Sequence, residues 1–75
     1  MNKEGRKKIA EALEHLESAQ SILEGMGEEE QEKFDNLTEG LQQGERGQQF
    51  EANAQALNEA FEAVGTAIDQ LGEVQ

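Results

Sequence analysis

The fold is decided by the stretch FEANAQALNEAFEAVGTAIDQLGEV, which spans residues 50–74. Its main apolar positions recur at alternating steps of four and three residues: Phe50, Ala54, Leu57, Phe61, Val64, Ile68 and Leu71. This heptad spacing places them along one side of an α-helix. A second line runs beside the first and widens the apolar face: Ala56, Ala60, Ala63 and Ala67. The stretch therefore predicts a long helix whose apolar side must be covered.

The first third of the chain repeats this pattern and predicts a second long helix over about residues 3–24. Asn2 is suited to cap its first turn, and its inward positions are Ile9, Leu13, Leu16, Gln20 and Leu23. We expect it to stop at Gly25-Met26-Gly27, because glycine is common just beyond a helix C-terminus. A short helix over 28–37 should follow, since negative charge is favoured in a first turn such as Glu28-Glu29-Glu30. The last helix should then run over about 45–73.

Together these elements predict an all-α fold in one domain, residues 1–75: a helical hairpin of two long helices with a short middle helix. The expected first helix is about 33 Å long and the last about 45 Å, at 1.5 Å per residue. The uncovered length of the last helix predicts packing as a homo-oligomeric bundle, most simply a two-fold dimer. The candidates for the oligomer core are Phe50, Leu57, Phe61, Val64, Ile68 and Leu71.

The charge is strongly acidic and unevenly placed. Seventeen Asp and Glu residues face six Lys and Arg residues, for a net charge of −11. Residues 1–8 carry +3 and the remainder −14. Such a body repels nucleic acid and anionic lipid and suits a basic partner, although acidic surfaces also serve solubility alone. We therefore expect no direct nucleic-acid binding and, since no apolar run exceeds two residues, no membrane segment and no signal peptide.

No group of residues predicts catalysis or a metal site. The chain has no cysteine, and its only histidine, His15, is expected on the outer side of the first helix. Carboxylates on helix exteriors have no pocket to shift their pKa values. The spacing of Asp35, Glu39 and Glu45 does not match a calcium-binding EF-hand loop. We expect a protein that is not an enzyme and that needs no cofactor and no metal.

The connection between the short and the long helix has features of its own. Arg46 is the only cation of the second half, and we expect it to pair with Asp35, Glu39 or Glu45. Gly47 would permit a close chain crossing, and Leu41 would hold the connection against the core. Asp35, Asn36 and Arg46 then either lock this connection or present a partner-binding surface.

Two glycines, Gly65 and Gly72, lie one heptad apart inside the last helix. Each costs about 1 kcal/mol relative to alanine in a helix interior. They indicate either the close approach of a neighbouring backbone or an exposed flank that tolerates glycine.

The central segment EKFDNLTEGLQQGERG, residues 32–47, is similar to the centre of a family of small acidic helical accessory proteins of tailed phages and prophages. Those proteins share the basic start, the Glu- and Leu-rich first helix, a D-N-L-x-E-x-L-Q-x-x-E-R-G centre and a Leu- and Ala-rich last helix. This chain has Thr38 where proline is usual, which makes that turn less rigid here. The resemblance implies a phage-type accessory protein located in the cytoplasm of a bacterial host; it brings no known activity.

Three classes of function follow from charge and resemblance. The first is an interaction protein that binds and inhibits a host protein with a basic surface, such as a defence enzyme. The second is an oligomer that sequesters a nucleotide between subunits, supported only by Arg46 and the Lys3–Lys8 cluster; the third is a structural or assembly factor. For the first class, the partner-binding candidates are Glu28, Glu29, Glu30, Glu32, Asp35, Asn36, Glu45 and Arg46.

Overall fold

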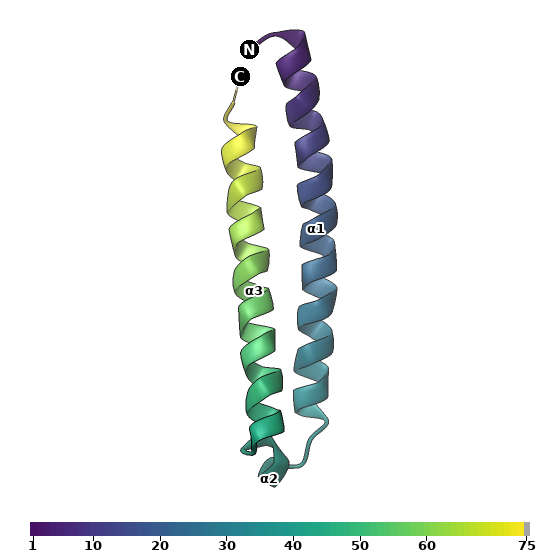
Figure 1. Cartoon of the computed structure of the whole chain (residues 1–75), viewed down its shortest axis with the longest axis vertical. Coiled ribbons are helices and arrows are strands. Elements are labelled where there is room, and N and C mark those ends of the chain that lie inside the picture. Colours follow the sequence, from purple (N-terminus) through teal and green to yellow (C-terminus); the bar gives the residue numbers. More distant parts are fainter. Residues whose placement is uncertain (75) are drawn as a thin grey trace.

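The computed structural model describes residues 1–74 as an antiparallel pair of long helices (Figure 1). Helix α1 spans Lys3–Asp35, the single-turn helix α2 spans Glu39–Gln42, and α3 spans Glu45–Gly72. Residues 1–74 contain no strand, and the hairpin has extents of 58 × 15 × 12 Å. The start of α1 and the end of α3 lie together at one end, with α2 at the other (Figure 1). The predicted all-α fold, with two long helices and a short middle one, is confirmed.

The predicted boundaries of the first two helices are wrong. α1 does not stop at Gly25-Met26-Gly27 but continues to Asp35, so the segment expected as a separate helix over 28–37 is mostly its last part. No glycine within residues 1–74 has a positive φ, so neither Gly25 nor Gly27 forms the left-handed cap that ends many helices. The helix continues because its inward line continues through Leu23, Gly27, Glu30 and Phe34 at the same four-three spacing.

The ends of α1 are capped by asparagines. The Asn2 side chain accepts a 2.8 Å hydrogen bond from the Gly5 backbone N–H, as the sequence predicted. At the other end the backbone N–H of Asn36 donates to the carbonyls of Glu32 and Phe34. The next backbone N–H, that of Leu37, donates to the Phe34 carbonyl over 3.1 Å, and this tighter turn ends the helix.

The connection is locked by Gln42 and Gly47, and Arg46 does not form the expected ion pair. The Gln42 side-chain amide donates to the Phe34 carbonyl over 3.1 Å and ties α2 to the end of α1. Gly47 is buried, and a Cβ there would lie 2.6 Å from Gln42 Cα and nearer still to its carbonyl oxygen, so the predicted close crossing is confirmed. Leu41 is 59% exposed, which contradicts the expectation that it holds the connection against the core.

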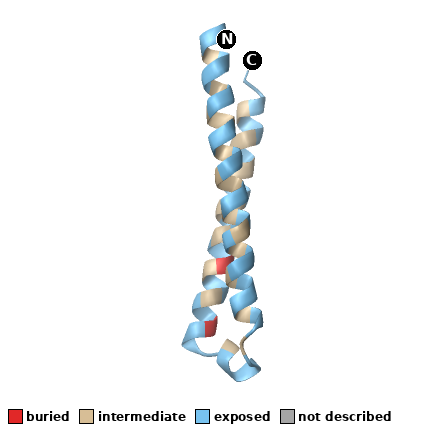
Figure 2. Ribbon diagram, turned by 90° about the vertical axis from the view of Figure 1, so that its right-hand side faces the viewer, coloured by how far each residue is buried: buried red, intermediate tan, exposed pale blue. Residues whose placement is uncertain are grey.

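The core of the hairpin is thin. Within residues 1–74 the only buried apolar side chain is Ala54, and no large side chain is fully buried (Figure 2). The six oligomer-core candidates, Phe50 to Leu71, are all half-buried on the side of α3 that faces α1. The expected difference in helix length is reversed, because α1 has 33 residues and α3 has 28. The reason for expecting an oligomer is therefore the incomplete burial of the core.

Three contacts fix the register of the two helices. Gln20 meets Gly65, Gly27 meets Leu57, and Asn53 donates to Glu30 over 3.3 Å. A Cβ at Gly65 would lie 2.9 Å from the Gln20 side-chain nitrogen, whereas Gly72 has open space around it. Gly65 thus makes room for a side chain and Gly72 is merely tolerated, so the close backbone approach suggested for this pair does not occur within the hairpin.

Candidate protein-interaction site

The two sides of the flat hairpin differ in chemistry. One side carries two grooves between α1 and α3, and its rims bear Glu24, Glu28, Glu51, Glu62 and Asp69. We call this the acidic side. Gly27 and Asn58 line one groove, and Gln20 and Gly65 line the other. Gly27 follows Gln20 by seven residues on α1, and Gly65 follows Asn58 by seven residues on α3. Residues seven apart lie on the same face of a helix, so the two grooves are on the same side of the hairpin.

The groove of the acidic side that contains Gly27, which we call the Gly27 groove, has an apolar floor and a polar rim. Its floor is formed by Leu23, Gly27, Ala54 and Phe61, and its rim includes Gln31, Gln55 and Asn58 beside Glu24, Glu28 and Glu51. Gly27 opens the floor, since its hypothetical Cβ would only just touch Leu57 at 3.8 Å. No Lys or Arg lines either groove. A groove of this kind suits a basic side chain that lays an aliphatic stem on the floor and its charge on the rim.

The opposite side is poor in charge. On α1 it carries Ala12, Ala19, Ile22 and Met26, spaced by seven, three and four residues; on α3 it carries Ala56, Ala60, Ala63 and Ala67. We call these eight residues the alanine side. The hydrogen bond from Asn53 to Glu30 shows that both lines share one side, because Glu30 follows Met26 by four residues and Asn53 precedes Ala56 by three.

The predicted partner-binding candidates do not form one surface. Glu28 lies on the rim of the Gly27 groove, whereas Glu29 and Glu32 do not line it and are exposed. Asp35 accepts a 3.0 Å hydrogen bond from the Gln31 side chain. Glu45 is the first residue of α3. Consecutive residues of α1 point in different directions, since the helix turns by 100° per residue, and the predicted acidic run is therefore dispersed around its circumference.

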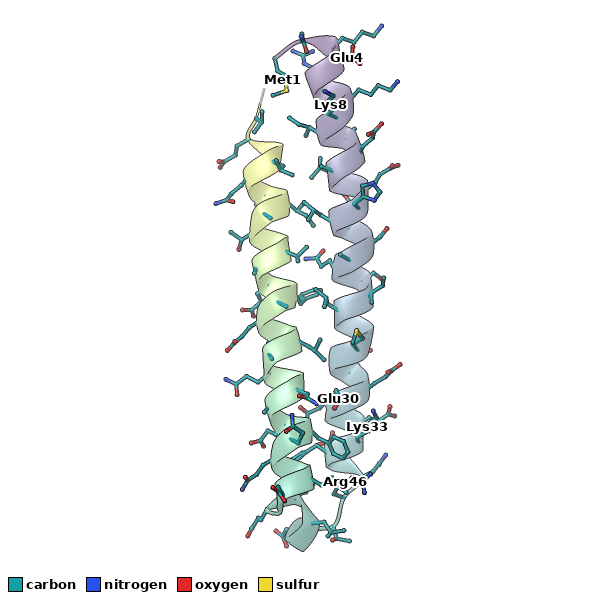
Figure 3. All side chains as sticks on the ribbon, viewed as in Figure 1. Met1, Glu4, Lys8, Glu30, Lys33 and Arg46 are labelled. Atoms are coloured by element: carbon teal, nitrogen blue, oxygen red, sulfur yellow. The ribbon has the colours of Figure 1, made fainter. Side chains whose placement is uncertain are left out.

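Glu30 is occupied within the hairpin. Its carboxylate receives hydrogen bonds from Lys33 at 3.1 Å and from Asn53 at 3.3 Å. These bonds, that of Lys33 first, lower the pKa of Glu30 from its ordinary value of 4.5, and burial opposes them. Glu30 therefore holds α1 to α3 near the connection (Figure 3).

The cations at this end gather around an aromatic ring. Lys33 Nζ lies 5.9 Å and Arg46 Cζ lies 6.0 Å from the centre of the Phe50 ring. Arg46 has no carboxylate partner within the part of the chain that the structure describes, which corrects the predicted pair with Asp35, Glu39 or Glu45. The Arg46 guanidinium lies over the ring of Phe50 and not beside a carboxylate.

Sequence reasoning missed two groups of residues. Glu24 and Glu51 form the acidic rim together with Glu28, but they come from different helices and only the register of the hairpin brings them together. Gln42 was not singled out, although it lies between Gly40 and Gly44 in the central segment. A polar residue in a glycine-rich connection was the available signal that the Gln42 side chain would bond to a backbone carbonyl.

Other kinds of site lack support in the described part of the chain. Residues 1–74 contain no cluster of three His, Asp or Glu placed to hold a metal ion. Within the same residues no helix is both long and apolar enough to cross a membrane. His15 is exposed beside Glu14, Glu17 and Ser18, on a part of α1 that faces away from α3, as expected. Comparisons with protein-family models, with curated proteins and with solved structures find no match to this chain.

Proposed function

We propose that this protein is an acidic interaction module that binds a basic surface of another protein through its acidic side. The observation that carries the proposal is the Gly27 groove, whose rim holds Glu24 and Glu28 from α1 and Glu51 from α3 around an apolar floor, with no cation among them. Three carboxylates without a cation give the groove a negative potential, which attracts a cationic side chain. The groove therefore matches a Lys or Arg side chain better than any acidic or neutral ligand.

The resemblance to phage accessory proteins indicates the setting of this interaction. We propose that the partner is a host protein in the bacterial cytoplasm, such as a defence enzyme whose basic surface would otherwise bind nucleic acid. An acidic helical body that occupies such a surface competes with nucleic acid for it and inhibits the enzyme.

Sequestration of a nucleotide has less support. Phosphate binding calls for Lys, Arg or a glycine-rich cradle at the ligand site. The Lys3–Lys8 cluster lies at the end of the hairpin opposite to Arg46, and neither groove contains a cation. A homo-oligomer is proposed on separate grounds: no large apolar side chain within residues 1–74 is fully buried in the single chain.

The proposal is tested by affinity capture from a bacterial lysate with three forms of the full chain. The first is the wild type. The second, the groove triple, carries Glu24→Gln, Glu28→Gln and Glu51→Gln. The third is a charge-matched control with Glu11→Gln, Glu14→Gln and Glu29→Gln, which are exposed residues outside both grooves. Each triple changes the net charge from −11 to −8.

The result separates the classes of function. A host protein with a basic surface that is held by the wild type and the control but lost with the groove triple supports the proposal. Equal capture by all three forms contradicts it. Capture of phage structural proteins would support an assembly factor in its place. Circular dichroism of the three forms checks that each remains helical.

A further inference from the structure

We infer that the alanine side is the interface at which a second copy of this chain docks, with the two hairpins parallel and α1 of each lying on α3 of the other. This goes beyond the proposed homo-oligomer, because it assigns the face and the symmetry. It does not depend on what the acidic side binds.

The first argument is that the alanine side, unlike the acidic side, exposes large apolar side chains. Ile22 is 62% exposed and Met26 is 46% exposed, and both lie in the line of α1 that contains Ala12 and Ala19. Val74, 44% exposed, lies just beyond the end of α3. The alanine side extends over about 21 Å along α1, from Ala12 to Met26, at 1.5 Å per residue.

The second argument is charge. Each chain carries −11, so two copies repel unless the surfaces that meet are free of carboxylates. Neither line of the alanine side contains an acid between Ala12 and Met26 or between Ala56 and Ala67, whereas acids rim both grooves of the other side. The alanine side is therefore the face at which two such chains can meet.

The third argument is the complementary size of the side chains. In the observed register, in which Gly27 meets Leu57 and Gln20 meets Gly65, Ile22 and Met26 lie at the height of Ala56, Ala60 and Ala63. A two-fold axis along the hairpin keeps these heights and places α1 of one copy on α3 of the other. The large side chains of α1 then enter the space above the alanines of the partner, and small Ala12 lies at the height of Leu71 and Val74.

The alternative two-fold axis, perpendicular to the hairpin, fits less well. It would place α1 on α1 and α3 on α3 in antiparallel hairpins. Ile22 and Met26 would then hold the first pair of helices apart, while the alanines of the second pair would leave a gap between them. Close packing without voids disfavours that arrangement.

Two neighbouring substitutions test the interface. Ile22→Glu adds a charge to the alanine side, and the matched control, Ser21→Glu, adds the same charge to the outer surface of α1. Light scattering at micromolar concentration should give twice the 8.3 kDa chain mass for the wild type and the control. It should give a lower mass, or an unfolded chain by circular dichroism, for Ile22→Glu. A wild type that is a folded monomer, or an Ile22→Glu variant that keeps the dimer mass, would overturn the inference.

A second measurement addresses the symmetry and does not depend on disrupting the fold. The chain has no cysteine, so Ile22→Cys and Ala60→Cys each give a protein with a single thiol. We expect mixed and oxidised samples to contain a disulfide-linked pair of one chain of each kind, identified by intact mass. Ser21→Cys mixed with Ala60→Cys should not give it. A dimer that does not link Ile22→Cys to Ala60→Cys would overturn this face and symmetry while leaving the homo-oligomer and the acidic-side proposals intact.

Discussion

Asn53 of α3 donates a hydrogen bond to Glu30 of α1 over 3.3 Å, and so joins the two helices across residues that are 23 apart in the chain. Lys33 donates to the other carboxylate oxygen of Glu30 over 3.1 Å. These hydrogen bonds join α1 to α3 near the connection, between the two lines of the alanine side. They also make the stability of the hairpin depend on pH.

The pH dependence has a definite sign. The pKa of Glu30 is lowered in the folded chain, so its stabilising contribution is fully present above the ordinary value near 4.5 and is lost as the pH falls through the lowered pKa. Glu30→Gln should therefore lower the melting temperature at pH 7, and the difference from wild type should shrink as the pH falls below about 4.5. Thermal melts over this range measure it. Glu29→Gln, which removes the same charge without these contacts, should not show a difference that disappears in acid.

A second prediction concerns the continuous helix α1. Gly25 lies within it, and a Cβ at this position would meet nothing within 4 Å. Gly25→Ala should therefore raise the free energy of unfolding by about 0.5–1 kcal/mol, the usual advantage of alanine over glycine in a helix. Urea unfolding measures the change. A loss of stability would mean that α1 ends at this glycine after all.

Gly47 should respond in the opposite way. Its Cβ would collide with the backbone of Gln42, which cannot move aside as a flexible side chain would. Gly47→Ala should therefore cost about 1–3 kcal/mol, the range for overpacking a well-packed position. The same urea measurement applies, and Gly72→Ala is the control because Gly72 has open space. A neutral effect at Gly47 would show that α3 does not cross α2 so closely.

The turn before α2 allows a stabilising proline. Thr38 has a φ of −66°, within the range that proline fixes, and its side chain makes no capping hydrogen bond. Within residues 1–74 its backbone N–H donates no hydrogen bond. Thr38→Pro should add about 0.4–1 kcal/mol to the free energy of unfolding by restricting the unfolded chain. A loss of stability would indicate that the residue before it, Leu37, cannot adopt the extended conformation that proline requires.

The sequence predicted those parts of the fold that depend on periodicity. The heptad line from Phe50 to Leu71 defines α3, and Asn2 marks the start of α1. The end of α1 was missed because two glycines resemble a stop. The cost of about 1 kcal/mol for each glycine is smaller than the gain from continuing the inward line to Phe34.

The candidate site was harder to predict because it depends on register. Glu28 was found, but Glu51 was not, since nothing in a single helix shows which carboxylates of its neighbour line the same groove. Glu24 was missed although helical spacing alone places it beside Glu28, four residues later on α1. The expected ion pair of Arg46 also failed for a local reason. The guanidinium lies over the ring of Phe50, four residues further along the same helix, and not beside the carboxylates of the connection.

The most direct test of the acidic side is the rate at which the protein associates with the partner found by affinity capture. Opposite charges accelerate association, and salt screens that acceleration. The wild type and the control triple should therefore associate quickly at low salt and more slowly at high salt. The groove triple should be slow at low salt and depend less on salt, while remaining folded. Equal association rates for all three forms at both salt concentrations would contradict the account.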